Sequence, residues 1–207
     1  MKTIQEVYDG FIEKYTDCNN LLANSTILYQ NKVQHNGCIY NFKMHSAIVE
    51  HCFMQIFLAW EFFLEKSFLL YLNNACDMKG ETYVRYGLPV DNEHAYSMVK
   101  GMKQYPDWTN LNEINTLSNI YFKDSGPYNL LTSNPVELAH IKTIRNKISH
   151  VSEKSTRTFN SLLVQTITRS TNVSVCDFLI SFKNGSETYY TYYTYILKSY
   201  VEAICNK

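Results

Sequence analysis

The scarcity of chain-breaking residues is what most limits how this chain can fold. Only seven glycines and four prolines are spread over 207 residues. Because Gly and Pro end regular elements and form tight turns, so few of them favour long helices over many short strands. A chain of this length with 45% hydrophobic residues can bury one sizeable core. The sequence therefore predicts an all-α fold in a single domain.

Apolar residues that recur at three- and four-residue steps place the predicted helices. The segments expected to be helical are about 3–34, 44–75, 93–104, 112–123, 135–152, 156–168 and 187–205. Turns or irregular connections are expected at 35–40, 80–91 and 126–127. Residues 173–182 are expected to form a short strand or an extended segment.

The segment 135–152 carries the clearest helix-start pattern in the chain. An Asn cap, a Pro at the first helical position and an acid at the third come together in Asn134-Pro135-Val136-Glu137. The apolar residues that follow share one stripe at helical spacing: Leu138, Ile141, Ile144, Ile148 and Val151. This pattern predicts an amphipathic helix with one buried side.

The end of this predicted helix combines a cation, an amide and a titratable base in Arg145, Asn146 and His150. At roughly 100° per residue, Arg145 falls at the edge of the apolar stripe and His150 lies about 140° further round, beside Asn146. One straight helix therefore cannot aim Arg145 and His150 at a single atom. Either the helix breaks near His150, or a second copy of the helix supplies the missing half. The alternative is structural: Arg145 pairs with a carboxylate and His150 decorates a helix end.

The run from residue 145 to 150 resembles the Arg-x4–6-His motif of the HEPN superfamily (higher eukaryotes and prokaryotes nucleotide-binding), in which Asn commonly follows the Arg. An apolar stretch with spaced acids at 53–72 precedes the motif, and residues 175–179 lead into a final helix, as in many small stand-alone bacterial members. The resemblance is strongest over 135–152, with looser support from about 45 to the C-terminus.

The resemblance implies a HEPN-like helical bundle that dimerises across the motif helix. It also implies metal-independent endoribonuclease activity, with Arg145, His150 and Asn146 as catalytic residues and no cofactor. The settings it suggests are toxin–antitoxin, abortive-infection or anti-phage systems, with an antitoxin or a sensor protein as a further partner. Residues 1–40 carry no family pattern and are treated as an N-terminal helical extension of a core at 44–207.

One residue departs from a branch of this family. Members paired with nucleotidyltransferase antitoxins have a Tyr two residues after the motif His, where the modification occurs. This chain has Ser152 there. Silencing by tyrosine adenylylation at that position is therefore not expected.

The chemistry of RNA cleavage suits these residue types. Attack by the 2′-hydroxyl needs a base, an acid for the leaving 5′-oxygen, and positive charge on the phosphorane. A His with its ordinary pKa near 6.5 serves as base or acid near neutrality, and an Arg offers a planar fork of donors to phosphate oxygens. Asn146 does not titrate, so it is expected to orient His150 or the phosphate, with a structural helix-to-helix hydrogen bond as the alternative.

The charge around the motif is locally basic. The whole chain balances 19 basic against 19 acidic residues, so bulk charge gives no indication of nucleic-acid binding. Between residues 140 and 157, Glu153 is the single acid and Arg145 is accompanied by four more cations: Lys142, Lys147, Lys154 and Arg157. These four are predicted to bind RNA phosphates; an ordinary solvated helix face is the alternative.

The sequence predicts a cytoplasmic protein with no membrane partner. Residues 1–6 lack the apolar core of a signal peptide. The stretch 53–72 has about the length needed to span a bilayer, but it contains Glu61, Glu65 and Lys66. Each such charge costs roughly 2.5–3.5 kcal/mol near the bilayer centre. A buried bundle helix is therefore the interpretation.

Cysteines and histidines give no metal-binding pattern. The six cysteines have no CxxC pairs and are expected to be reduced thiols. His45, His51 and Cys52 lie close together in the sequence, but their spacing matches no zinc pattern. No metal is assigned.

Three function classes remain at this point. The first is a homodimeric, metal-independent endoribonuclease that cuts single-stranded or loop RNA, acting as a toxin or a defence effector. The second is a non-catalytic HEPN module for dimerisation or nucleotide binding. The third is an unrelated helical interaction protein in which the motif is accidental. An intact Arg145 and His150 in a basic surround favour the first.

Overall fold

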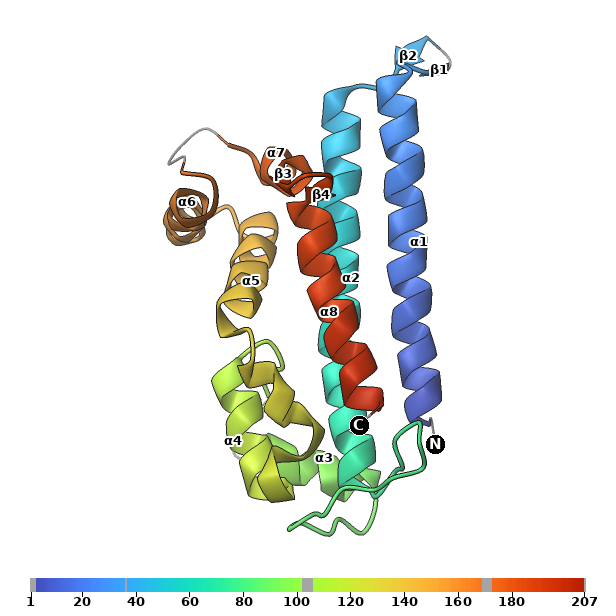
Figure 1. Cartoon of the computed structure of the whole chain (residues 1–207), viewed down its shortest axis with the longest axis vertical. Helices are drawn as coiled ribbons and strands as arrows, with labels where there is room; N and C mark the ends of the chain where they lie inside the picture. Colours follow the sequence, from blue (N-terminus) through green and yellow to red (C-terminus); the bar gives the residue numbers. More distant parts are fainter. Residues whose placement is uncertain (1–2, 36, 102–105, 169–172, 207) are drawn as a thin grey trace. The chain divides into compact units, whose positions relative to one another are not determined.

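The computed structural model describes residues 3–35, 37–101, 106–168 and 173–206 (Figure 1). The chain divides into two compact units. One comprises Met1–Ile12, Ala59–Pro135 and Leu197–Lys207, and the other comprises Glu13–Leu58 and Val136–Ile196. We call them unit 1 and unit 2, and each is described by itself.

The elements are almost all helical, which confirms the predicted all-α class. The long helices are α1 (Ile4–Gln30), α2 (Phe42–Leu72), α5 (Pro135–Ser149), α6 (Glu153–Ile167) and α8 (Tyr189–Cys205). The shorter ones are α3 (Asn92–Lys100), α4 (Leu111–Tyr121), the 3-10 helix η1 (Lys123–Thr132) and α7 (Val175–Ile180). Two small antiparallel pairs join β1 (Gln34–His35) to β2 (Cys38–Ile39), and β3 (Phe182–Asn184) to β4 (Glu187–Thr188).

Two local predictions are wrong. Residues 175–180, expected to be extended, form the helix α7, because the Ser174 hydroxyl accepts from the Asp177 amide and caps a helical turn. The helix expected at 135–152 ends at Ser149. Val151, expected on its apolar stripe, is fully exposed, whereas Leu138 is buried as predicted.

Aromatic packing around the second half of α2 forms the core of unit 1. The Phe68 ring lies 5.4 Å from Trp108, 5.2 Å from Phe122 and 5.1 Å from Tyr128, measured between centroids. Two buried hydroxyl contacts strengthen this core: Ser67 and Tyr128 have their hydroxyl oxygens 2.9 Å apart, and the Tyr71 hydroxyl donates to the Ile204 carbonyl oxygen at 2.9 Å. Helix α8 is thereby fixed to α2 within this unit.

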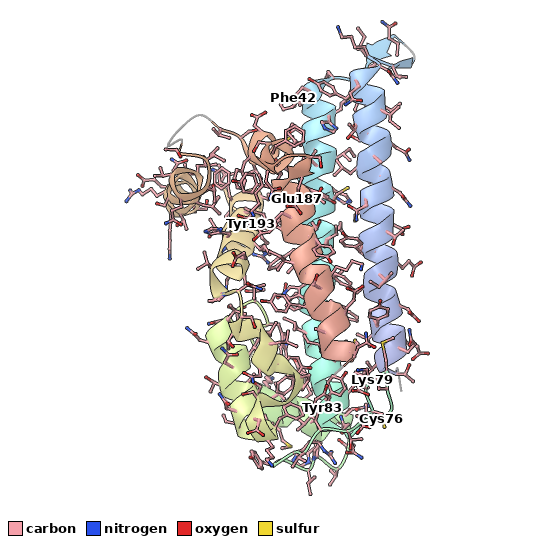
Figure 2. All side chains as sticks on the ribbon, in the orientation of Figure 1. Phe42, Cys76, Lys79, Tyr83, Glu187 and Tyr193 are labelled. Carbon is pink, nitrogen blue, oxygen red and sulfur yellow. The ribbon has the colours of Figure 1, made fainter. Side chains whose placement is uncertain are left out.

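Unit 2 is built where the first half of α2 meets α1, α5 and α8. Phe53 of α2 contacts Tyr190 of α8, with centroids 6.4 Å apart. Tyr193, labelled in Figure 2, has its hydroxyl 3.0 Å from Nδ1 of His140 on α5. Burial raises the pKa of the Tyr193 phenol, so it stays protonated. These contacts fix the position of α5, which carries the motif.

Helix α2 is also the helix with membrane-like composition. Among the described residues it alone is long and apolar enough to cross a bilayer, and 44% of its most apolar window is buried inside the protein. Its Ile56, Phe63 and Phe68 side chains are fully buried. The structure is thus compatible with a soluble protein in which α2 is a core helix.

Candidate functional site

The turn between α5 and α6 places His150. The His150 amide still donates to the Asn146 carbonyl oxygen at 3.0 Å, so His150 completes the last turn of α5. Ser152 and Ser155 then start α6 through reciprocal hydrogen bonds, each hydroxyl accepting from the other residue's amide. The Ser155 hydroxyl also donates to the His150 carbonyl oxygen at 2.6 Å. The backbone of His150 is therefore held from both sides.

An open surface pocket of about 240 Å³ lies at this turn, and His150 and Lys154 are exposed in it. Its lining combines one imidazole, one ammonium, one amide and four hydroxyls: Thr143, Asn146, His150, Ser152, Lys154, Ser155 and Thr158. Such a surface offers hydrogen-bond donors and two groups able to carry positive charge. It suits a polar anion such as a phosphate.

Arg145 does not line this pocket; it faces α2. Its guanidinium carbon lies 5.7 Å from the centre of the Phe57 ring, and its Nη1 donates to the Asn146 Oδ1 at 3.2 Å. Its Nε is buried, and no acceptor for it lies among the residues that the structure describes. Arg145 forms no ion pair with the residues that the structure describes. The guanidinium is therefore held by an aromatic face and an amide.

Asn146 links Arg145 to the pocket. Its side-chain oxygen accepts from Arg145, while the residue itself lines the pocket with His150. The sequence left open whether Asn146 orients His150 or forms a structural bond between helices. Its observed bond is to its neighbour on the same helix.

The structure bears on both geometric alternatives for the motif, a helix break near His150 and a second copy of the helix. Helix α5 does end just before His150. His150 lines the pocket together with Asn146, whereas Arg145 lies on the side toward Phe57. Within one chain, Arg145 and His150 therefore do not share the pocket.

The four other cations predicted around the motif have different surroundings. Lys154 lines the pocket. Lys147 donates to the Thr156 hydroxyl at 2.7 Å and so ties α5 to α6. Arg157 pairs with Glu153 one turn earlier at 2.6 Å, and both side chains are more than 70% exposed. Lys142 is half-buried on α5. Of these four cations, Lys154 is the one that lines the same pocket as His150.

The neighbouring His and Cys residues on α2 have separate environments. His45 is buried, stacks on Tyr29 and has Nδ1 2.7 Å from the Ser25 hydroxyl. His51 is exposed, and Cys52 is buried against Cys18. Among the described residues, no three His, Cys, Asp or Glu side chains gather in an arrangement suited to a metal ion.

Four pocket residues escaped the sequence-based prediction: Thr143, Ser152, Ser155 and Thr158. The Ser-x-x-Ser spacing of 152 and 155 is a readable helix cap, and it would have indicated that a new helix starts there. Thr143 and Thr158 sit on different helices, so only the fold brings them together. No family model, curated protein or solved structure matches this chain.

Proposed function

We propose that this protein is a HEPN-like, metal-independent endoribonuclease that cuts single-stranded or loop RNA as a homodimer. The observation that carries the proposal is the convergence of Asn146, His150 and Lys154 on one pocket. The pocket combines an imidazole, the ammonium group of Lys154 and neutral hydrogen-bond donors. Cleavage of a phosphodiester by a neighbouring hydroxyl requires groups of these kinds.

In the proposed reaction His150 removes the proton from the ribose 2′-hydroxyl. The 2′-oxygen attacks the phosphorus, the bond from phosphorus to the 5′-oxygen breaks, and an acid protonates that oxygen. The products are a 2′,3′-cyclic phosphate and a free 5′-hydroxyl. Lys154 and Asn146 hold the phosphate oxygens, where positive charge and aimed donors stabilise the phosphorane.

A second copy would complete this site. One chain presents one imidazole to the pocket, and its Arg145 reaches the pocket only through Asn146. Two copies related by a two-fold axis next to α5 would contribute two imidazoles, one as base and one as acid. In that arrangement the Arg145 guanidinium of the partner copy would approach the phosphate.

The second candidate is a non-catalytic module that binds a nucleotide in the same pocket. The position of Arg145 against Phe57 favours it, because a catalytic cation is expected to contact the phosphate. This candidate predicts that RNA binds and is not cut.

The test is a digest of mixed RNA in the presence of chelator with native protein, Arg145→Ala and His150→Ala. We expect native protein to degrade RNA and His150→Ala to lose at least about a hundredfold in rate, the lower end of the range for one acid–base group. His51→Ala, which removes an exposed histidine of α2, is the matched control and should keep full activity. Equal degradation by every protein would indicate a contaminant, and a strict magnesium requirement would contradict the mechanism.

A further inference from the structure

The end of the α1–α2 helix pair carries seven exposed large apolar side chains. We define the α1–α2 tip as residues 27–35 and 37–44, which include the end of α1, the β1–β2 hairpin and the start of α2 (Figure 1). Its exposed large apolar side chains are Ile27, Leu28, Tyr29, Val33, Ile39, Phe42 and Met44. Ile27 is 54% exposed and Ile39 is 47% exposed. Exposed apolar groups gathered at one end of a helix pair indicate an interaction site.

The charge of this region has one sign. No Asp or Glu occurs between Asp17 and Glu50, whereas Lys32 and Lys43 lie within the tip. Both lysines are exposed. The whole chain is neutral, so this acid-free stretch stands out from its average composition. A surface of apolar side chains with lysines fits a partner that is apolar and negatively charged.

The tip is a preformed structure. Tyr40 donates its amide to the Val33 carbonyl oxygen at 2.8 Å and so closes the hairpin. Below it, the Ser25 hydroxyl lies 2.8 Å from the Tyr40 hydroxyl and 2.7 Å from Nδ1 of buried His45. The Tyr29 ring packs against Phe42, labelled at the start of α2 in Figure 2, with centroids 5.8 Å apart. The exposed side chains are thus presented on a rigid support, which lowers the entropy lost on docking.

We propose that the α1–α2 tip docks on the surface of an anionic lipid bilayer. Exposed aliphatic and aromatic side chains enter the boundary between headgroups and acyl chains, while Lys32 and Lys43 meet the headgroup phosphates. This is attachment to one face of the bilayer, so it is compatible with α2 being a core helix rather than a spanning one. It departs from the sequence-based expectation of no membrane partner, and it does not depend on the proposed ribonuclease activity.

Two other occupants fit less well. A second copy would bring two identical lysine-bearing, acid-free tips together, and like charges disfavour such a pairing. RNA would meet the lysines but would leave Ile27, Val33 and Ile39 without an apolar partner, since nucleic-acid interfaces are polar and strongly charged. A bilayer surface satisfies both kinds of side chain.

The first test is sedimentation of the 207-residue chain with vesicles. One set contains phosphatidylcholine alone and the other contains equal parts of phosphatidylcholine and phosphatidylglycerol. We expect binding to the anionic vesicles. Lys32→Gln with Lys43→Gln should weaken it by about fivefold for each lysine, the effect of one charge near an anionic surface. Ile39→Asp should weaken it by about tenfold or more.

Matched controls are available on exposed residues outside the tip. Lys79→Gln with Lys123→Gln removes two exposed lysines, and Val90→Asp changes an apolar residue that is 84% exposed. These variants should bind as the native protein does. Equal weakening of vesicle binding by control and tip variants would overturn the proposal. So would a lack of binding to anionic vesicles, or binding to neutral vesicles as tight as binding to anionic ones.

A second measurement locates the contact. Cys38 lies in the hairpin, and Cys38 and Cys76 are the exposed cysteines among the described residues. In a Cys76→Ser background, an environment-sensitive fluorophore on Cys38 should shift its emission to the blue when anionic vesicles are added. Sedimentation without that shift would show that another surface binds. A tip variant that changes the oligomeric state in light scattering, and not vesicle binding, would assign the tip to contact with a second copy. A tip variant that changes the affinity for RNA, and not vesicle binding, would assign the tip to nucleic acid.

Discussion

At the scale of single residues, the candidate site depends on where α5 stops. His150 lines the pocket because the helix ends at Ser149 and the Ser155 hydroxyl holds the His150 carbonyl oxygen. Arg145 is held by Phe57 and Asn146, and its buried Nε has no hydrogen-bond partner among the described residues.

His45 gives a pH-dependent prediction at the same scale. Burial lowers the pKa of His45 below its ordinary 6.5, so the folded protein holds it neutral. The unfolded chain takes up the proton as pH falls through 6.5, and the folded protein does so only at lower pH. The contribution of His45 to the free energy of unfolding is therefore fully present above 6.5 and is lost as pH falls below it.

We expect urea denaturation to show native protein losing more stability than His45→Gln between neutral pH and the acid range. The comparison cancels the titration of groups that both proteins share. Parallel loss in the two proteins would contradict the assignment. His51→Gln, at an exposed histidine, is the control and should behave as native protein does.

At the scale of elements, the reciprocal serine cap is what starts α6. Ser152→Ala removes the hydroxyl that accepts from the Ser155 amide, and an N-cap of this kind contributes about 1 kcal/mol to the free energy of unfolding. We expect that loss in urea denaturation. Ser161→Ala, at an exposed position inside α6, should change stability by less than about 0.5 kcal/mol. Equal effects of the two substitutions would show that the cap does not stabilise α6.

Helices α5 and α7 show which parts of the secondary structure could be predicted from the sequence. The start of α5 at Pro135 was predictable because Pro and Glu137 are local indications that do not depend on tertiary structure. Its end was not, because Val151 continues the apolar spacing yet is fully exposed. Residues 173–182 suggested an extended segment through their β-branched valines, but the Ser174 cap and burial of Phe178 favour a helix.

Within the site, sequence proximity predicted that Asn146 and His150 lie together, since they are one helical turn apart. It did not predict the contact of Arg145 with Phe57, because α2 and α5 are distant in the chain. The hydroxyl of Thr158 joins the pocket for the same tertiary reason. What the sequence could not provide was the packing between helices.

At the scale of the whole molecule, the proposed homodimer makes activity depend on both copies. If one groove needs both imidazoles, a dimer of one native chain and one His150→Ala chain is inactive. After full subunit exchange of equal amounts, about a quarter of the dimers carry two native chains. We therefore expect about a quarter of the activity of an undiluted native sample, measured as RNA cleaved per unit time. Half of the activity would show that each chain works alone.

We propose above all that His150 directs attack by a ribose 2′-hydroxyl. The most direct test uses an RNA oligonucleotide cut at a single mapped position, and a second oligonucleotide with a 2′-deoxy sugar immediately before that position. In chelator, we expect the first oligonucleotide to give a 2′,3′-cyclic phosphate end and the second to remain uncut. His150→Ala should cleave neither of them. Cleavage of the deoxy-substituted oligonucleotide at the same position, or an unaltered product yield from His150→Ala, would contradict this proposal.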